Sequence, residues 1–278
     1  MTQPDHAALP PIAFIGGGNM ASAILGGLMR QGLLPTAVEV VEPFEEARAR
    51  LAQQFGIAPQ AAASDALARC RLIVWAVKPQ TFAEAAVPVR AWAGDGLHLS
   101  VAAGIPSESI ARWLGTENVV RAMPNTPALV GQGVTGLFAR SAVSADGRAL
   151  VEQVLAPTGD LLWVDAERAL DAVTAVSGSG PAYVFYFIEA MTEAGIEMGL
   201  PPEQAKRLAI GTFTGASALA RASTEPPAVL RERVTSKGGT THAAISALEA
   251  DGVKALFKQA IRAAERRAGE LAAEFGRA

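Results

Sequence analysis

A glycine-rich turn near the N-terminus carries the first residue pattern with a chemical meaning. An apolar run over 12–15 leads into this turn, and the apolar positions of an expected helix follow it. The order of strand, G-x-G-x-x-A turn and helix is typical of proteins that hold the pyrophosphate of a dinucleotide. Gly16 allows the tight turn, Gly18 lets the backbone approach the phosphates, and small Ala21 lets helix and strand pack closely. The residues expected to contact the dinucleotide are Gly16, Gly18, Asn19, Met20 and Ala21.

The acidic residue after the next apolar run bears on the choice of dinucleotide. The run over 38–41 ends at Glu42, whose carboxylate can accept hydrogen bonds from the adenosine ribose hydroxyls, and this favours NAD. Arg48 and Arg50 follow closely and can instead reach the 2′-phosphate of NADP. The sequence therefore leaves both NADH and NADPH open as the reduced cofactor.

Three further loops follow apolar runs that are expected to be neighbouring strands. In an open parallel sheet the ligand lies outside the carboxyl ends of the strands. Lys78 is placed there to meet a cofactor phosphate or ribose, although an ordinary surface lysine is the alternative. Asn125 stands in a proline-stiffened turn and is expected to meet the nicotinamide amide. The candidate cofactor contacts in these loops are Ala76, Val77, Lys78, Pro79, Ala103 and Asn125.

Two glycine-rich turns in the second half of the chain each precede an expected helix. The first covers 177–181 and includes Ser177, and the second covers 236–241. A helix N-terminus offers unpaired amides and the positive end of the helix dipole, which suit a carboxylate ligand. The alternative for each turn is a flexible helix start that binds nothing.

The elements that must position these loops alternate along the chain. Strands are expected at 12–15, 38–41, 72–77, 97–101, 119–123, 134–139 and 161–164. Alanine-rich helical stretches separate most of them, which indicates βαβ units and a parallel sheet buried on both faces. The fold class is therefore α/β, with a Rossmann-like doubly wound sheet over 1–165. From about Arg168 onward the strand signal is lost, so we expect an all-α domain over 166–278.

Composition narrows the class of protein. The formal net charge is −3 and the 24 basic residues are scattered, so no nucleic-acid partner is expected. No apolar run reaches the ~20 residues that a membrane helix needs, so no membrane partner is expected either. Cys70 is the only cysteine, which rules out an intrachain disulfide and fits a cytoplasmic protein. His6, His98 and His242 are isolated, so no metal site is expected.

Taken together, these motifs resemble the pyrroline-5-carboxylate reductase family, in order and over nearly the whole chain. The segments that carry the resemblance are 16–21, 76–80, 102–104, 121–127, 175–183 and 234–241, and the last two are the most specific. The resemblance implies NAD(P)H-dependent reduction of 1-pyrroline-5-carboxylate to L-proline, with a helical domain that forms a homodimer, often assembled into a decamer. It also implies that the second glycine turn holds the substrate carboxylate and that Thr241 reaches the ring nitrogen. The implied substrate contacts are Ser236, Gly238, Gly239 and Thr240, with Ser177 from the first turn.

The sequence departs from the family pattern at two places. Lys237 stands where the family usually has proline, and Ala63-Ser64 stands where it usually has an asparagine that contacts the cofactor. A β-hydroxyacid dehydrogenase is one alternative, but the segment 182–188 lacks the lysine and asparagine that this class places there. A non-catalytic protein that senses the cofactor is the other alternative, because a fold does not fix a function.

Overall fold

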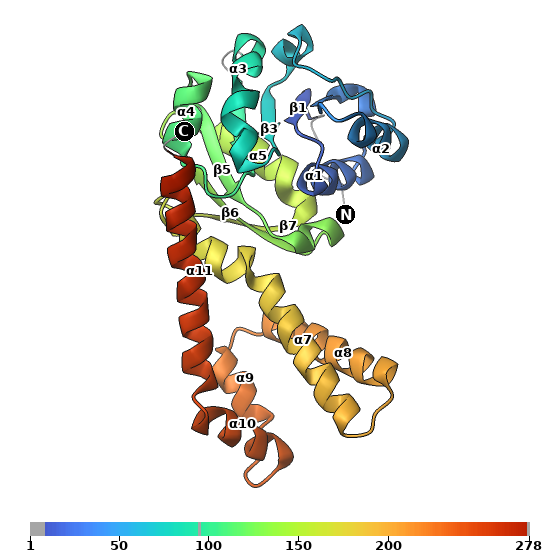
Figure 1. Cartoon of the computed structure of the whole chain (residues 1–278), viewed down its shortest axis with the longest axis vertical. Coiled ribbons are helices and arrows are strands. Elements are labelled where there is room, and N and C mark those ends of the chain that lie inside the picture. The colour runs from blue at the N-terminus through green and yellow to red at the C-terminus, as the bar shows by residue number, and fades with distance from the viewer. Residues whose placement is uncertain (1–8, 94–95, 277–278) are drawn as a thin grey trace. The chain divides into compact units, whose positions relative to one another are not determined.

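The computed structural model describes residues 9–93 and 96–276. Its first half contains a seven-stranded sheet in the order β2-β1-β3-β4-β5-β6-β7, with helices on both faces (Figure 1). The strands are β1 (Ile12–Ile15), β2 (Val38–Val41), β3 (Leu72–Trp75), β4 (Leu97–Ser100), β5 (Val119–Met123), β6 (Gly133–Ala139) and β7 (Gly159–Trp163). The sheet confirms the predicted α/β class and matches the expected strand positions closely.

Two strands, β6 and β7, run opposite to the parallel sheet that the sequence predicted. Strands β1 to β5 pair in parallel, whereas β6 pairs antiparallel to β5 and parallel to β7. The connection from β5 to β6 contains only a short 3-10 turn over Thr126–Val130, and a parallel pair needs a longer crossover. The short connection therefore reverses the chain direction. At the start of β6, Gly133 lies so close to Gly159 of β7 that no side chain fits between them.

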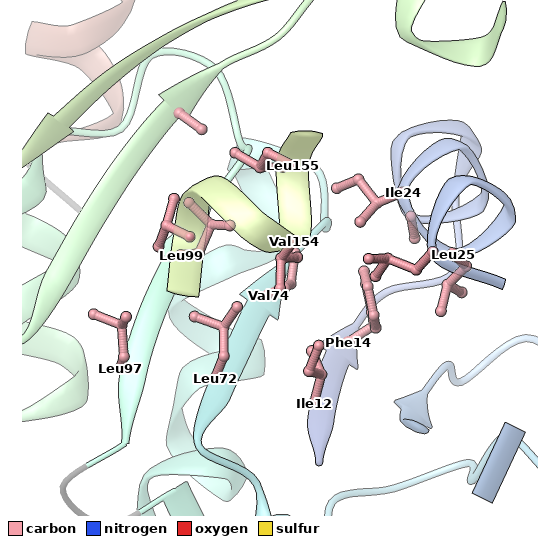
Figure 2. Packing of buried hydrophobic residues seen from close by; sticks show 14 of the residues in the cluster. Ile12, Phe14, Ile24, Leu25, Leu72, Val74, Leu97, Leu99, Val154 and Leu155 are labelled. Atoms are coloured by element: carbon pink, nitrogen blue, oxygen red, sulfur yellow. The ribbon is translucent and has the colours of Figure 1, made fainter. Parts of the chain in front are cut away.

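Alternate residues of the strands build two cores on opposite faces of the sheet. On one face the strands pack against helices α1 (Asn19–Arg30) and α5 (Ala145–Leu155), and Figure 2 shows Ile24 and Leu155 over Phe14, Val74 and Leu99. On the other face they pack against α3 (Phe82–Ala93) and α4 (Ser107–Leu114). Both faces are apolar because both are covered, as expected for a parallel sheet with crossover helices. The strand ends, and the loops that follow them, are thereby held in fixed register.

A part-buried ion pair links β5 and α4 to the turn before α6. The Arg121 guanidinium in β5 donates to the Glu167 carboxylate at 2.5 Å, and the same carboxylate accepts the Ser107 amide at 2.6 Å. Burial alone would raise the pKa of Glu167, but the bonds from Ser107 and the charge of Arg121 outweigh it and lower the pKa. Both the amide and the hydroxyl of Ser107, the first residue of α4, donate to Glu167. The cap position of α4 is occupied by Pro106.

The remaining elements complete the first compact unit, which covers residues 9–93, 96–178 and 265–276 of the described chain. They include α2 (Glu45–Phe55), α6 (Ala169–Val173) and a π-helical turn over Thr174–Gly178. The short 3-10 turns cover Pro35–Ala37, Asp65–Arg69, Pro79–Thr81, Thr126–Val130 and Ala156–Thr158. The last turns of the C-terminal helix belong here too, because Leu271 and Phe275 pack on Gly104.

The second compact unit covers residues 179–264 and is entirely helical. It contains α7 (Gly180–Glu197), α8 (Pro202–Ala222), α9 (Pro227–Arg233), α10 (Thr240–Ala250) and most of α11 (Val253–Phe275). Helices α7 and α8 pack against each other, and Gly195 allows Ala205 to approach closely. The sequence predicts a domain boundary after residue 165; in the structure, α6 and the π-turn that follow lie in the same compact unit as the sheet, up to Gly178.

None of the described helices is both long and apolar enough to cross a membrane.

The buried histidine of β4 makes stability sensitive to acid. His98 is 1% exposed, and its Nδ1 accepts a hydrogen bond from Trp75 Nε1 at 3.0 Å. Burial lowers the pKa of His98 from 6.5 to about 4. Between these two values the unfolded chain takes up a proton that the folded chain refuses, so stability falls as the pH falls.

We therefore expect the free energy of unfolding to lose ~2 kcal/mol through His98 between pH 7 and pH 5. Urea denaturation at both pH values should show this loss, and the His98→Gln variant, which keeps an acceptor for Trp75, should lack it. Equal pH dependence of the two proteins would contradict the assignment.

Candidate active site

The glycine turn after β1 is built so that no side chain fits at its first position. Gly16 has φ +93°, and a Cβ there would lie 2.7 Å from the Ala76 carbonyl oxygen. Its amide donates to the Val41 carbonyl at 2.8 Å, so Gly16 is held between the ends of β2 and β3. A Cβ on Gly17 would meet Leu51 at 2.4 Å. Gly16 is therefore required by the fold itself, whereas a side chain at Gly17 would need the Leu51 side chain to move.

Gly18 is different, because its glycine is not required by any protein contact. The nearest heavy atom to a Cβ at Gly18 is the Ala76 oxygen, 4.0 Å away, and both Gly18 and Asn19 are exposed. The first helical bond of α1 runs from the Ser22 amide to the Gly18 carbonyl at 2.9 Å. The amides before Ser22 therefore lie ahead of the helical ladder, at the positive end of the dipole. Open space beside such amides fits a dinucleotide pyrophosphate.

Glu42 holds the glycine turn by a hydrogen bond to its backbone. Its side chain is 6% exposed, one carboxylate oxygen accepts the Gly17 amide at 2.8 Å, and the other accepts the Phe44 amide at 3.0 Å. Arg48 reaches back to the carbonyls of Glu42 and Pro43 at 2.9 and 2.7 Å. The sequence predicts that the Glu42 carboxylate meets the ribose, and in the structure this carboxylate holds the glycine turn. Arg48 is hydrogen-bonded beside it.

The loops after β3 and β4 lie at the same edge of the sheet as the glycine turn. Ala76 and Val77 form one wall of the turn, because their atoms lie against Gly16. Lys78 is exposed, and Pro79 begins the 3-10 turn that follows it. Ala103, after β4, is exposed as well. The structure therefore brings the predicted residues of the first unit together along the carboxyl ends of β1, β3 and β4.

Asn125, in the loop after β5, has its side chain bound to protein at both ends. Its Oδ1 accepts the Val134 amide at 2.9 Å, and its Nδ2 donates to the Ser177 carbonyl at 3.1 Å. The sequence assigned this amide group to the nicotinamide. In the structure it joins the loop to β6 and to the π-turn.

Ser177 lies in that π-turn, within the first unit. Its hydroxyl donates to the Val173 carbonyl at 3.1 Å, so it is used in the turn itself. The structure thus places Ser177 in a different compact unit from the other predicted substrate contacts.

Those contacts occupy one turn of the second unit, at the start of α10. Gly238 has φ +77°, and a Cβ on Gly239 would lie 2.6 Å from Ser236 Oγ, so the serine hydroxyl packs over the glycine backbone. The Gly239 amide donates to the Ser236 carbonyl at 3.0 Å, and the first helical bond is from the Ala243 amide to the Gly239 carbonyl. The amides of Thr240 and Thr241 therefore precede the helical ladder, beside the Ser236 hydroxyl. This is a donor set for a carboxylate.

The neighbours of this turn are placed as follows. Thr241 is half-buried, whereas Thr240, Lys237 and His242 are exposed.

No metal-binding group of histidine, cysteine or acidic side chains occurs within residues 9–93 and 96–276, and His6 lies outside this part of the chain. Burial raises the pKa of the Cys70 thiol to about 11, so this cysteine is unsuited to act as a nucleophile.

Sequence reasoning missed the polar residues that support the loops from inside the first unit. Glu167 and Arg121 form the part-buried pair described above, and Arg140 donates to the hydroxyl of Ser107 at 3.2 Å. A charged residue within the apolar pattern of β5 was the available signal, because a buried arginine requires a partner. The partner itself lies 46 residues away and has no local signature.

Comparison with known proteins gives two matching family models. A model described as pyrroline-5-carboxylate reductase dimerisation matches residues 167–271. A model described as NADP oxidoreductase, coenzyme F420-dependent, matches residues 11–104. The first covers the helical half, and the second covers the strands and loops around the glycine turn.

Full-length relatives and solved structures agree with these models. The pyrroline-5-carboxylate reductase of Pseudomonas aeruginosa is 46% identical over 271 residues, covering 96% of this chain and 98% of that protein. The one from Haemophilus influenzae is 41% identical, covering 94% and 97%. The structure of the Coxiella burnetii pyrroline-5-carboxylate reductase superposes with a TM-score of 0.89 at 36% identity, covering 95% and 98%. A Plasmodium falciparum pyrroline carboxylate reductase with NADP bound has a TM-score of 0.85 at 26% identity, covering 95% and 99%.

The contrast between Gly16 and Gly18 gives a test of the dinucleotide site. Gly16→Ala should destabilise the protein by about 2 kcal/mol or more, because it combines a clash with a positive φ. Gly18→Ala should change the melting temperature by only about 2 °C, because the protein leaves room for the methyl group. It should nevertheless raise the Kd for NADPH and NADH by about 10-fold, since the methyl group occupies the space of the pyrophosphate.

Calorimetric titration and thermal unfolding of the two variants measure both quantities. Unchanged cofactor affinity in Gly18→Ala would move the pyrophosphate away from this turn.

Proposed function

The chain belongs to the pyrroline-5-carboxylate reductase family, and on that premise we propose how its residues divide the reduction of 1-pyrroline-5-carboxylate to L-proline between them. The protein is an oxidoreductase that uses NADPH or NADH and acts on a cyclic C=N bond. The proposal rests on one observation: the chain holds two helix N-termini that no side chain caps. One has Gly18 at its cap position in the first unit, and the other has Gly239 there in the second.

The first of these N-termini holds the cofactor. When bound, the reduced nicotinamide supplies the hydride. The amides from Gly18 to Met20 hold the pyrophosphate, with Gly18 and Asn19 exposed, and Ala21 lets α1 approach the sheet. Lys78 and Ala103 line the same edge of the sheet. Glu42 and Arg48 lie at the adenosine side, so the difference between NADH and NADPH is set there.

The second N-terminus holds the substrate. The Ser236 hydroxyl and the amides of Gly238, Thr240 and Thr241 bind its carboxylate, with the dipole of α10 adding to the attraction. The Gly239 amide already bonds to Ser236 and serves to hold the turn. Fixing the carboxylate orients the ring, and orientation can supply a large share of the rate.

Thr241 is the residue that we assign to the ring nitrogen. A protonated iminium is already electrophilic, so the protein need not provide a strong acid. A threonine hydroxyl is a poor acid by itself, but it can donate or accept a hydrogen bond and so keep the nitrogen and its proton in place. Thr241 is half-buried in the first turn of α10, on the same turn as the carboxylate site.

The second unit leaves large apolar side chains exposed, and this supports assembly with another copy of the chain. Of its residues, only Gly195, Ala205 and Ala209 are buried within the described chain. Large apolar side chains such as Phe185, Leu208 and Leu219 are more than half exposed. A helical unit without a core of its own needs a partner surface, and a second copy supplies one. We therefore propose a homodimer through these helices, which can assemble further into a decamer.

We also propose a cytoplasmic location. A lone buried cysteine and a net charge of −3 support a cytoplasmic enzyme that works on a small molecule without a nucleic-acid or membrane partner.

The role of Thr241 is tested by removing its hydroxyl. Thr241→Ala should lower kcat by about 10-fold to 100-fold with 1-pyrroline-5-carboxylate, because one hydrogen bond to the reacting nitrogen is lost. Thr241→Ser should restore most of the rate, and the Kd for the cofactor should stay unchanged in both variants. Following NAD(P)H absorbance gives the rates, and a fully active Thr241→Ala enzyme would remove Thr241 from the site.

The assembly is tested by light scattering on the purified protein. We expect a mass of twice the 28.7 kDa chain or a larger even multiple at micromolar concentration. Leu219→Glu, which places a charge on the exposed apolar face of α8, should shift the population toward the monomer. A monomeric wild-type protein would contradict the proposal.

A further inference from the structure

The side chain of Asn125 makes two bonds of opposite kind to two separate parts of the first unit. The Oδ1 atom accepts from the Val134 amide at the start of β6, and the Nδ2 atom donates to the Ser177 carbonyl in the π-turn. Because the first partner only donates and the second only accepts, the orientation of the amide group is fixed. Few side chains of this length could make both bonds.

The π-turn is held at a second point close by. A Cβ on Gly178 would lie 2.5 Å from the Met123 methyl carbon, so Gly178 packs directly on the side chain at the end of β5. Residues 123–125 therefore hold residues 177–178 by both packing and hydrogen bonding. π-helical turns of this kind are rare and are found frequently at functional sites.

These contacts hold the chain directly before it enters the second unit. Gly178 is the last residue of the first unit before the chain enters the second, and α7 begins at Gly180. The residues that we assign to the cofactor lie in the first unit, and those that we assign to the carboxylate and the ring nitrogen lie in the second. The segment held by Asn125 is thus a covalent link between the two sets of residues.

We propose that Asn125 is a positioning residue that fixes the π-turn for hydride transfer, and that it is not a ligand of the nicotinamide. Its effect is on alignment, because misplacement by about 1 Å can cost about 100-fold in rate while leaving binding intact. This inference rests on the proposed function for its kinetic part. Its structural part concerns only the first unit.

The test uses Asn125→Asp and Asn125→Ala in the full-length enzyme. The aspartate can still accept from Val134 but faces the Ser177 carbonyl with an oxygen, and the alanine loses both bonds. Asn118→Asp is the matched control, since it adds the same charge just before β5 and likewise replaces an amide donor to a backbone carbonyl, that of Gly96, away from the π-turn. For each protein, kcat and KM for 1-pyrroline-5-carboxylate, the Kd for NADPH and NADH, and hydrogen exchange of residues 134 and 174–180 are measured.

We expect Asn125→Asp to lower kcat by about 10-fold or more, with the cofactor Kd within about 3-fold of wild type. Exchange over 174–180 should quicken in both Asn125 variants, exchange at Val134 should quicken most in Asn125→Ala, and Asn118→Asp should behave as wild type. An increase in cofactor Kd with unchanged kcat would overturn the proposal in favour of a nicotinamide ligand. A loss of thermal stability with unchanged kcat and Kd would overturn it in favour of a purely structural role.

Failure of the proposed function is recognised separately. If wild-type protein binds the cofactor but does not turn over the imine, the substrate assignment falls. The exchange and Kd measurements still decide whether Asn125 fixes the π-turn: quickened exchange with unchanged Kd supports it, and unchanged exchange overturns it.

Discussion

The close approach of Gly16 to the Ala76 carbonyl oxygen is the contact on which the cofactor half of the molecule depends. Strand β1 lies between β2 and β3, so the chain that leaves it must turn within the space between their ends. Only a residue without a side chain and with positive φ fits there. Because the turn is this tight, α1 begins immediately after it, and its N-terminal amides open at the carboxyl edge of the sheet. The exposed position of Gly18 follows from the buried position of Gly16.

The polar side chains around this edge are largely engaged with the protein itself. Glu42 holds the Gly17 amide, Glu167 holds Ser107 and Arg121, and Asn125 joins the β5 loop to the π-turn. In the first unit the groups left open for ligands are the backbone amides after Gly18 and the exposed Lys78, and in the second unit they are the amides at the start of α10 with the hydroxyls of Ser236 and Thr241. Such groups bind and orient anions without a side chain whose pKa is near neutrality. That suits the reduction of an iminium, in which the hydride comes from the cofactor and the substrate is already activated.

Local patterns in the sequence predicted the parts of the fold that local physics determines. The strand positions, the glycine turn and the turn at 236–241 all have short signatures of residue type and spacing. The antiparallel β6 was not predicted, because strand direction depends on the length of the connection rather than on the strand residues. The hydrogen bonds of Asn125 were not predicted for a similar reason, since its partners Val134 and Ser177 are distant in the sequence and only the fold brings them together. Glu167 was not found at all, because an exposed loop glutamate and a buried partner of Arg121 have the same local sequence.

The central claim is that this chain transfers a hydride from a reduced nicotinamide to the imine carbon of 1-pyrroline-5-carboxylate. The most direct measurement follows the hydride itself, with reduced cofactor that carries deuterium at one or the other face of the nicotinamide C4. The account predicts that one of the two labelled cofactors gives L-proline with a single deuterium on its δ carbon, and that the other gives unlabelled proline. Proline without deuterium from either cofactor, or no proline at all, would contradict it.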